Sequence, residues 1–284
     1  MSDHKASNFS LSSYFERIGF KSDGIPEPTL ETLQKLHYLH LHSIPFENLA
    51  LHYGTKKEIL IDSESIFNKL VVQKRGGYCF EQNGLFSKVL KELGYNFYTG
   101  MASVASEVDG KFRYLGRSHM VSIVKYEEQL YLADVGFGSA GLSAILPLKE
   151  DISFSAIDNQ EFRFKRTTHP TGSHLDWSST GFLLESRYLT PTETEWKPAY
   201  YFTLTEFTYD DYELSNYYTS TNPGVIFRQH VMVTMPTLDG RVTLFDRSLK
   251  IRNQEGIATK TILENDEEVM LALKEHFGIV IDLE

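Results

Sequence analysis

The sequence predicts an α+β protein in which helices and strands occupy separate stretches of the chain. Apolar residues recur at helical spacing through about residue 94, whereas they alternate with polar residues from Tyr95 to about Phe207. The remaining residues mix strand patterns with one helix pattern. Because the two periods follow one another instead of alternating along the chain, a βαβ arrangement is not expected. A chain of 284 residues is long enough for a well-buried core and for two or three structural parts.

Four helices are expected in the first stretch, and each combines an apolar side with a start or stop signal. Thr29 can act as the N-cap of the second helix, and Pro45 marks its end. Gly94 follows the last apolar residue of the fourth helix, at a position where glycine commonly ends helices. The expected helices begin at Phe9, Thr29, Asp62 or Ser63, and Cys79.

Short runs with a period of two predict the strands, since alternating side chains point to opposite faces of a sheet. In the second stretch these runs cover residues 95–104, 118–126, 129–135, 161–167 and 199–207. The third stretch has two further runs, 229–235 and 241–246, joined across Asp239-Gly240. Its one expected helix carries an apolar stripe from Val269 to Phe277 and ends at Gly278.

Composition and charge argue against several classes of protein. The 38 acidic residues outnumber the 28 basic ones, which gives a net charge of −10. Nucleic acids and anionic membranes attract basic surfaces, so we expect neither as a partner. No window approaches the ~20 apolar residues of a membrane span, and the N-terminal residues lack the apolar segment of a signal peptide. A single cysteine forms no disulfide within the chain, so a cytoplasmic protein is expected.

That cysteine, Cys79, lies at the start of the fourth expected helix, shortly after two glycines in "KRGGYCFEQNGLF". A lone cysteine can simply be a small buried hydrophobic residue. Its position favours a nucleophile instead, because the N–H groups and the positive dipole end of a helix N-terminus favour a thiolate over a thiol. The two glycines would also leave room for a substrate to approach the sulfur. Such a nucleophile needs a base, and the base needs a residue that orients it.

A predicted hairpin supplies both. The segment "RSHMVSIVKYEEQLYLADVGFG" forms two strands joined at Glu127-Glu128. If these two residues form the loop, the residue numbers of each cross-strand pair add up to 255, so Val121 faces Asp134. His119 and Asp134 are then diagonal neighbours on one face of the sheet. A loop of odd length would put them on opposite faces. An aspartate in the apolar run "LYLADVGF" also needs a partner if it is buried. We therefore expect Cys79, His119 and Asp134 to form a catalytic triad.

Two other patterns are weaker. The segment "GFGSAG", Gly136 to Gly141, matches the G-x-G-x-x-G pattern of dinucleotide-binding folds, but Pro147 leaves no room for the helix that must follow. We interpret it as a glycine loop after a strand. Three histidines of the second helix lack the accompanying ligands of a metal site, so we expect hydrogen-bonded or surface side chains and no metal. These histidines are His37, His40 and His42.

Four segments together resemble the arylamine N-acetyltransferase family. They are "SIPFENLALHYG" from residue 43, "RGGYCFEQNGLF" from residue 75, the "SHM" and "LADVGFG" strands, and "NYYTSTNPGVIF" from residue 216. Each is weak alone, but all occur in order over nearly the whole chain. The resemblance implies a helical bundle, a β-barrel and a C-terminal α/β lid around a cysteine-protease-like catalytic core. We place these parts at residues 1–94, 95–207 and 208–284.

The resemblance also implies the roles of individual residues. It assigns the nucleophile to Cys79, the base to His119 and the orienting carboxylate to Asp134. It further implies that Glu47 and Arg75 form an ion pair that is structural and takes no part in the chemistry.

The acyl donor implied by the resemblance is acetyl-CoA. Gly116 and Tyr218 match family positions that contact coenzyme A, and Phe137 matches a position at the acceptor pocket, where an aromatic wall favours flat substrates. Residues 224–226 read Gly-Val-Ile, whereas family members often have small hydroxylated residues there. Backbone groups are therefore expected to replace some side-chain contacts with the donor. Two arginines are candidate phosphate partners, Arg113 and Arg117.

The expected reaction is ping-pong acetyl transfer to an aromatic amine or hydrazine. Cys79 attacks acetyl-CoA, coenzyme A leaves, and the amine takes the acetyl group while His119 relays its proton. A cysteine hydrolase or transglutaminase-like enzyme could use the same triad on amides, but it leaves the "PFEN" and "NYYTSTNP" segments unexplained. A non-catalytic binding module predicts a missing triad residue, and none is missing from the sequence.

Overall fold

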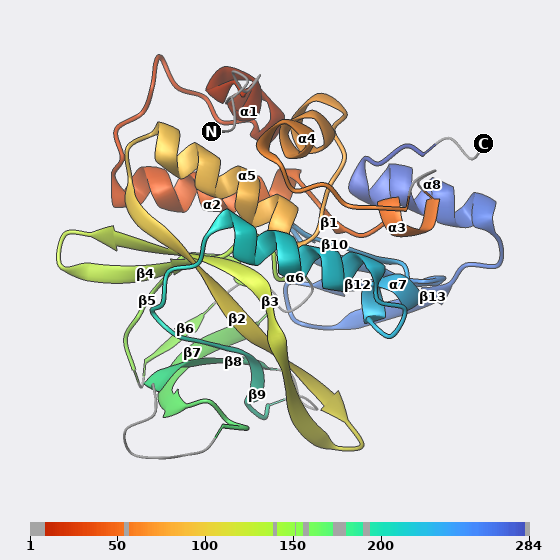
Figure 1. The fold of residues 1–284 in the computed structure, drawn as a ribbon. Coiled ribbons are helices and arrows are strands. Elements are labelled where there is room, and N and C mark those ends of the chain that lie inside the picture. The colour runs from red at the N-terminus through yellow and green to blue at the C-terminus, as the bar shows by residue number, and fades with distance from the viewer. Residues whose placement is uncertain are drawn as a thin grey trace.

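The chain folds into a helical part, a barrel-like sheet and a smaller sheet covered by one helix (Figure 1). The computed structural model describes residues 9–53, 57–138, 141–150, 152–155, 159–172, 180–189 and 194–281. Helices predominate up to Glu92 and strands from Asn96 to Phe202, and the described elements do not alternate as βαβ units, which confirms the α+β class predicted from the sequence.

The N-terminal part is helical. Its elements are α1 (Leu11–Ile18), α2 (Leu30–Ser43), α3 (Ala50–Tyr53), α4 (Ser63–Phe67), a π-helical turn (Asn68–Val72) and α5 (Cys79–Glu92). The Thr29 side chain caps α2 as predicted, and Asp62, not Ser63, caps α4 by accepting the Ser65 N–H at 2.9 Å. Gly94 follows α5 with φ of +78°, a left-handed conformation that favours glycine.

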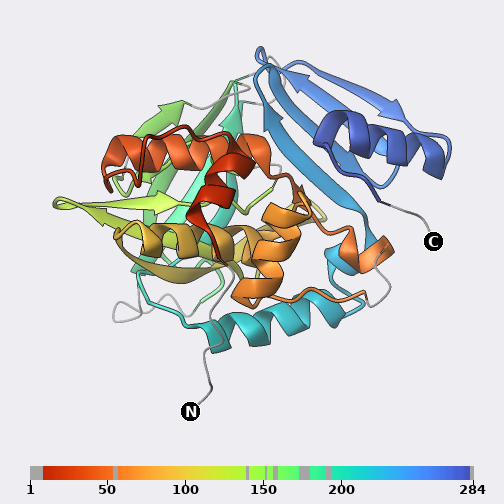
Figure 2. The ribbon, with the colours of Figure 1, turned by 90° about the horizontal axis from the view of Figure 1, so that it is seen from above.

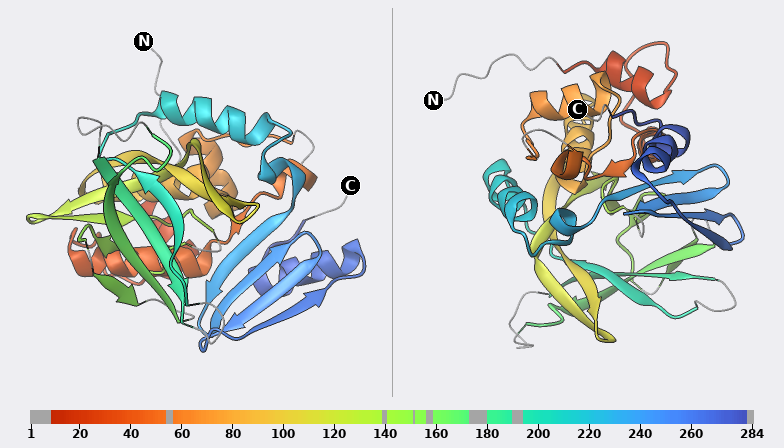
Figure 3. Two further views of the ribbon diagram at one scale, coloured as in Figure 1. Left: turned by 90° about the horizontal axis from the view of Figure 1, so that it is seen from below. Right: turned by 90° about the vertical axis from the view of Figure 1, so that its right-hand side faces the viewer.

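An eight-stranded antiparallel sheet curls below these helices into a nearly closed barrel (Figures 1 and 3). Its order is β5-β4-β3-β2-β9-β8-β7-β6. The strands are β2 (Asn96–Val108), β3 (Lys111–Tyr126), β4 (Gln129–Ala133), β5 (Leu146–Pro147), β6 (Ser153–Ser155), β7 (Gln160–Thr168), β8 (Thr180–Tyr188) and β9 (Lys197–Phe202). Alternate side chains fill the interior with aromatic and aliphatic groups, among them Phe164, Phe202 and Val121.

The C-terminal part contains a five-stranded antiparallel sheet of order β1-β10-β11-β12-β13. Its elements are α6 (Tyr209–Thr221), α7 (Ile226–Gln229), β10 (Met232–Thr237), β11 (Gly240–Phe245), β12 (Ser248–Asn253), β13 (Ala258–Ile262) and α8 (Asp266–Phe277). Strand β1 (Phe46–Glu47) comes from the N-terminal part and pairs with β10. Helix α8 lies on this sheet, and their apolar sides share one core (Figure 2).

Helix α6 was not predicted, because only one helix was expected after residue 207. It lies apart from the five-stranded sheet and alongside β3 (Figures 2 and 3). Its buried side chains are spaced for a helix but are mostly polar, so no apolar stripe reveals it. These side chains are Tyr212, Asn216, Thr219 and Ser220.

Within the described residues, no helix has the length and apolar character needed to cross a membrane. The division into residues 1–94, 95–207 and 208–284 stays a prediction. Strand β1 shows that the segments are interwoven, since residues from the middle of the helical part complete the C-terminal sheet.

Candidate active site

Cys79 is the first residue of α5, where this helix meets the barrel-like sheet. Its side chain is almost fully buried, and its sulfur lies 3.6 Å from the Ser118 carbonyl oxygen. The start of the helix is fixed by Glu81, whose carboxylate accepts the Tyr78 N–H at 3.0 Å and pairs with Lys69 at 2.6 Å. The N–H groups of the first helical turn, which have no intrahelical acceptor, therefore lie near the sulfur.

The two glycines before Cys79 serve the packing of the chain, so the expectation that they leave room for a substrate was wrong. A Cβ atom on Gly76 would lie 2.0 Å from the Pro45 carbonyl oxygen. A Cβ atom on Gly77 would lie 2.7 Å from the Glu81 carboxylate. Glycine is needed at both positions because neighbouring parts of the protein itself occupy that space.

The hairpin that carries the base forms in the predicted register. Ser122 of β3 pairs with Ala133 of β4, so paired positions sum to 255. Asp134 directly follows β4, and its Oδ2 accepts a hydrogen bond from Nε2 of His119 at 2.7 Å. The Cys79 side chain lies close to the same imidazole and contributes to the raised pKa of His119. The structure therefore brings the three predicted triad residues together in one buried site.

Three further donors hold the Asp134 carboxylate. Oδ1 accepts from the Asn83 side chain and from the Gly136 N–H, each at 2.9 Å, and Oδ2 accepts from the Tyr200 hydroxyl at 2.9 Å. Neither Asn83 nor Tyr200 was predicted from the sequence. Asn83 follows Cys79 by four residues, so helical spacing could have placed the two on one face of α5. Tyr200 lies on β9, and no local pattern connects it with the triad.

These contacts determine the protonation states of the buried groups. Burial alone would lower the pKa of His119, but the Asp134 carboxylate beside it raises that pKa to about 10. Burial alone would raise the pKa of Asp134, but the charge and hydrogen bond of His119 lower it, with help from Asn83. Imidazolium and carboxylate therefore coexist at neutral pH. Burial and the Asp134 charge raise the pKa of Tyr200 well above its usual range, so its hydroxyl stays a donor.

Aromatic rings border the triad. The Phe137 ring packs edge-on against the His119 ring, with 5.0 Å between the centroids. Phe46 lies 6.0 Å from Phe227, and both rings belong to the apolar cluster around Cys79. Phe137 thus lies beside the base, and its role at the acceptor pocket stays a prediction. Phe46 and Phe227 are neighbours of the nucleophile that were not predicted from the sequence.

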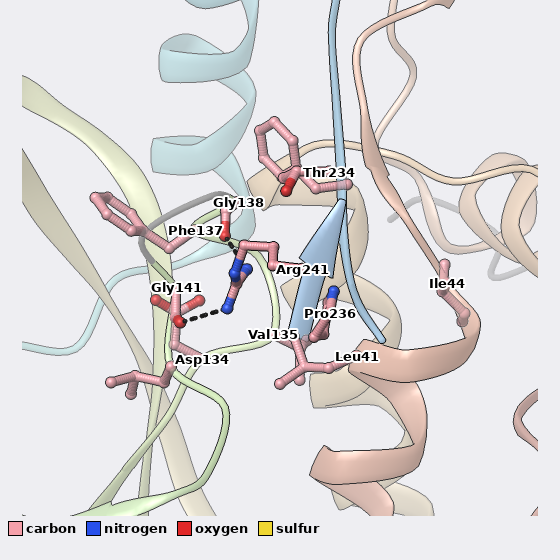
Figure 4. A pocket seen from close by; sticks show the side chains of 12 residues that line it. Leu41, Ile44, Asp134, Val135, Phe137, Gly138, Gly141, Thr234, Pro236 and Arg241 are labelled. Atoms are coloured by element: carbon pink, nitrogen blue, oxygen red, sulfur yellow. Dashed lines mark hydrogen bonds between the residues drawn. The ribbon is translucent and has the colours of Figure 1, made fainter. Parts of the chain in front are cut away.

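A small pocket lies next to these rings, where the helical part and the two sheets meet (Figure 4). Phe46 and Phe137 line it together with Asp134. Arg241 reaches it from β11, and its guanidinium points toward the chain that follows Asp134 (Figure 4). The C-terminal sheet therefore contributes to the surroundings of the triad.

The two residues predicted to contact coenzyme A lie on adjacent elements. Gly116 is exposed on β3, where the pairing with β2 has register shifts. Tyr218 is exposed on α6, one turn after Ser215, whose hydroxyl donates to the Arg117 carbonyl at 3.0 Å. Arg113 is also exposed on β3. Gly116 and Arg113 thus lie on the strand that carries His119, and Tyr218 lies on the helix alongside that strand. Donor binding by these residues stays a prediction.

Other residues singled out in the sequence are structural. Arg75 donates to the Glu47 carboxylate at 2.9 Å, which confirms the ion pair implied by the resemblance. His37 and His40 are buried and hydrogen-bonded, and burial lowers their pKa values to about 4 and about 3. Both are therefore neutral at pH 7. Across the described ranges, no group of three or more His, Cys, Asp or Glu residues could hold a metal ion.

Comparison with known proteins identifies the family. A family model described as N-acetyltransferase matches residues 29–284. The chain belongs to the arylamine N-acetyltransferase family. It is therefore an acyltransferase, as the sequence predicted.

Relatives in this family match the chain over most of its length. The arylamine N-acetyltransferase of Escherichia coli K12 is 30% identical over 273 residues, which cover 96% of this chain and 89% of the relative. The N-malonyltransferase of Fusarium pseudograminearum is 31% identical over 277 residues, which cover 89% of this chain and 79% of the relative.

Solved structures of the family share the fold. The arylamine N-acetyltransferase of Mycobacterium tuberculosis matches with a TM-score of 0.81 at 30% identity, over 95% of this chain and 94% of that one. The Mycobacterium marinum enzyme, solved in complex with CoA, matches with a TM-score of 0.82 at 28% identity, over 95% and 93% of the two chains. These matches confirm the predicted bundle, barrel and α/β lid.

Proposed function

We propose that this enzyme transfers the acetyl group of acetyl-CoA to arylamines and aryl hydrazines, and that Cys79 carries the acetyl group between the two substrates. The observation that carries the proposal is the buried group in which Cys79 lies close to His119 and His119 hydrogen-bonds to Asp134. A thiol with its own base and an orienting carboxylate is the arrangement of a covalent catalyst. The cytoplasmic location expected from the sequence stays a prediction.

In the first half-reaction, the Cys79 thiolate attacks the carbonyl carbon of the thioester. The bond between that carbon and the sulfur of coenzyme A breaks, and the imidazolium of His119 gives its proton to the departing sulfur. Asp134 holds the imidazolium in place through the 2.7 Å hydrogen bond. The products are acetyl-Cys79, neutral His119 and coenzyme A.

In the second half-reaction, the amine nitrogen attacks the acetyl carbon on Cys79. Neutral His119 takes the proton that the amine loses, and the carbon–sulfur bond breaks. The Cys79 thiolate and the His119 imidazolium are thereby restored. In both steps the N–H groups at the start of α5 are our candidates for stabilising the negative oxygen of the tetrahedral intermediate.

The donor site is proposed on the side of the molecule formed by β3 and α6. The CoA complex of the Mycobacterium marinum relative supports coenzyme A as the carrier of the acyl group. Gly116 and Tyr218 lie on these two elements, and Arg113 and Arg117 supply positive charge there in a chain of net charge −10. Phosphate groups need such local cations when the protein as a whole is acidic.

The acceptor class follows from the surroundings of the sulfur. Phe46, Phe137 and Phe227 present aromatic faces and edges near the triad, and these suit a flat ring. Arylamines are weakly basic, so a large fraction is neutral and nucleophilic at pH 7. An alkylamine such as a lysine side chain is mostly protonated at that pH, which makes it the poorer acceptor.

Malonyl-CoA is a second candidate donor, favoured by the N-malonyltransferase of Fusarium pseudograminearum at 31% identity. A malonyl group carries a carboxylate, which needs a cation or several N–H donors in a buried site. Arg241 lines the pocket beside Phe137, but its guanidinium donates to backbone carbonyls. We therefore favour acetyl-CoA over malonyl-CoA as the acyl donor. Offering both donors at equal concentration, and identifying the acyl group on Cys79 by mass spectrometry, decides between them.

The proposed function is tested by incubating the protein with acetyl-CoA alone and measuring the intact mass. We expect one added acetyl group, which peptide mapping places on Cys79 and which an arylamine then removes. Cys79→Ala should take up no label and form no product. A label on another residue, or product formed at full rate by Cys79→Ala, contradicts the mechanism. A cysteine hydrolase would instead cleave an amide substrate without any coenzyme A.

A further inference from the structure

A buried arginine of the five-stranded sheet reaches the chain that forms the aromatic wall of the site (Figure 4). Arg241 is only 5% exposed. Its Nη1 donates to the Gly138 carbonyl at 3.1 Å, and its Nη2 lies 3.5 Å from the Gly141 carbonyl. A buried guanidinium is costly unless its N–H groups find acceptors, so these carbonyls and Arg241 hold one another in place.

Gly138 is fixed from a second side as well. Its φ of +86° lies in the left-handed region, and its carbonyl also accepts the Gly141 N–H at 3.0 Å. A Cβ atom at this position would be 3.4 Å from the Phe46 ring, which shows how closely the ring covers the backbone. Gly138 is thus held both by Arg241 and by Phe46.

Phe137 directly precedes Gly138, so the direction of its side chain depends on how this backbone is held. Its ring lies 5.0 Å from His119 and 4.8 Å from Tyr200, both in edge-on contact. A continuous set of contacts therefore runs from β11 through Arg241 and Gly138 to the ring beside the catalytic base.

We propose that Arg241 is a positioning residue that holds Phe137 as a wall of the acceptor site. The C-terminal sheet then contributes to the choice of arylamine, although it supplies no member of the triad. This inference rests on the proposed acetyl transfer and deepens it, because it assigns acceptor selectivity to a residue outside the catalytic chain. It predicts that the second half-reaction depends on Arg241 and that the first does not.

The chain offers a matched control in Arg252. This residue pairs directly with Arg241 across β11 and β12, so both side chains lie on the same face of the sheet. Arg252 is 8% exposed, so it is buried to a similar extent as Arg241. It also donates to a backbone carbonyl, that of Gly256, at 2.6 Å. Its guanidinium, however, lies over the Tyr188 ring of β8, 4.0 Å from the ring centroid. Replacing either arginine should perturb the sheet, but only replacing Arg241 should let the Phe137 ring move.

The experiment compares Arg241→Met, Arg241→Lys and Arg252→Met with the wild type in two measurements. The first is the rate of Cys79 acetylation by acetyl-CoA alone, followed by intact mass. The second is kcat/KM for a one-ring and a two-ring arylamine at saturating acetyl-CoA. For Arg241→Met we expect acetylation within about twofold of the wild type, and a loss of about tenfold in kcat/KM for the acceptor. The ratio between the two arylamines should change as well, because the wall has moved.

Arg241→Lys should recover part of the acceptor kcat/KM, because an ammonium group can still donate to the Gly138 carbonyl. This variant also serves if Arg241→Met fails to fold. Arg252→Met should lower the melting temperature but leave the preference between arylamines unchanged. The inference is overturned if the Arg241 variants slow both half-reactions alike, if their acceptor preference stays that of the wild type, or if Arg252→Met shifts it equally. Absence of acetylation in the wild type overturns the proposed function itself.

Discussion

The Asn83 side chain donates to the Asp134 carboxylate at 2.9 Å and so ties the helix of the nucleophile to the strand of the orienting residue. The same amide nitrogen donates to the Met120 carbonyl at 2.7 Å, and the amide oxygen accepts the Val135 N–H at 3.0 Å. One side chain on α5 thereby contacts both arms of the hairpin. The distance between Cys79 and its base thus depends on a residue that takes no part in the chemistry.

Replacing Asn83 with Ala should therefore reduce both stability and activity. The change removes three buried hydrogen bonds, and we expect a loss of at least about 2 kcal/mol in the free energy of unfolding. Acetylation of Cys79 should slow in the folded variant, because Asp134 loses one of the donors that hold Oδ1. Urea unfolding and intact-mass kinetics measure the two effects. Ser87→Ala is the control. The Ser87 hydroxyl donates to the Gly84 carbonyl of the same helix, so its loss should change neither the unfolding free energy nor the acetylation rate by much.

Asp134→Asn should cause a severe loss of acetylation with little change in volume. The amide would offer an N–H toward the N–H of His119, which favours the wrong ring tautomer. The corresponding change in a serine-protease triad lowers turnover by roughly ten-thousandfold, and we expect a loss of similar order here. Asp134→Glu should retain more activity because it keeps the charge. Acetylation rates are to be measured on protein whose fold is confirmed by circular dichroism.

A second Asp–His pair provides the control for this substitution. Asp246, directly after β11, accepts a hydrogen bond from His230 at 2.7 Å, and both side chains are partly exposed. Asp246→Asn should leave the acetylation rate near that of the wild type. Near-normal acetylation in Asp134→Asn, by contrast, would mean that another residue orients His119.

The parts of this site that local sequence could predict are those that depend on short-range geometry. Hairpin register follows from a two-residue loop, so His119 and Asp134 could be placed on one face from the spacing of the residues alone. The start of α5 follows from helix signals around Cys79. Asn83 was equally accessible through its spacing of four residues, but an asparagine in a helix is too common to attract notice without the strand that it contacts.

The residues that sequence could not predict come from distant segments whose meeting depends on tertiary packing. Tyr200 reaches Asp134 from 66 positions further along the chain. Arg241 approaches Gly138 across 103 positions, from a sheet whose placement no periodicity encodes. Helix α6 was missed for another reason, since hydrophobic periodicity detects only helices that bury apolar side chains.

The ion pair between Arg75 and Glu47 should contribute to stability more than to catalysis. Glu47 is fully buried and Arg75 is 20% exposed, so Arg75→Met leaves a buried carboxylate without its cation. We expect a loss of about 3 kcal/mol in the free energy of unfolding. Adding Glu47→Gln to Arg75→Met should restore part of this free energy of unfolding, because the second change removes the uncompensated charge. A double-mutant cycle from urea unfolding measures the coupling between the two residues.

A second double-mutant cycle, on the exposed ion pair between Lys88 and Glu92, serves as the comparison. These residues lie four apart on α5 at 2.8 Å, and both remain accessible to water. Their coupling should be only about 0.3–0.5 kcal/mol, as for other exposed pairs at this spacing. Equal coupling in the two cycles would mean that burial of Glu47 adds nothing to the interaction with Arg75.

The two histidines that contact Asp134 should give opposite pH dependences of stability. The pKa of His119, about 10 in the folded protein, lies above the ordinary value of 6.5. Folding therefore favours its protonated form, and its contribution to stability is fully present below about pH 6.5 and is lost as pH rises toward 10. The pKa of His37, about 4, lies below 6.5, so its contribution is present above pH 6.5 and is lost as pH falls toward 4.

Glutamine replacements test this contrast, because they keep a hydrogen-bond donor but cannot titrate. The difference in unfolding free energy between wild type and His119→Gln should shrink from pH 6.5 to pH 10. The difference for His37→Gln should stay level over that range and shrink from pH 6.5 to pH 4. Both follow from urea unfolding at a series of pH values. A His119→Gln difference that remains constant up to pH 10 would show that the folded protein does not hold the proton on His119. The imidazolium would then be absent from the resting site, and the proton that coenzyme A takes away would come from the Cys79 thiol, passed on by His119 as a general base.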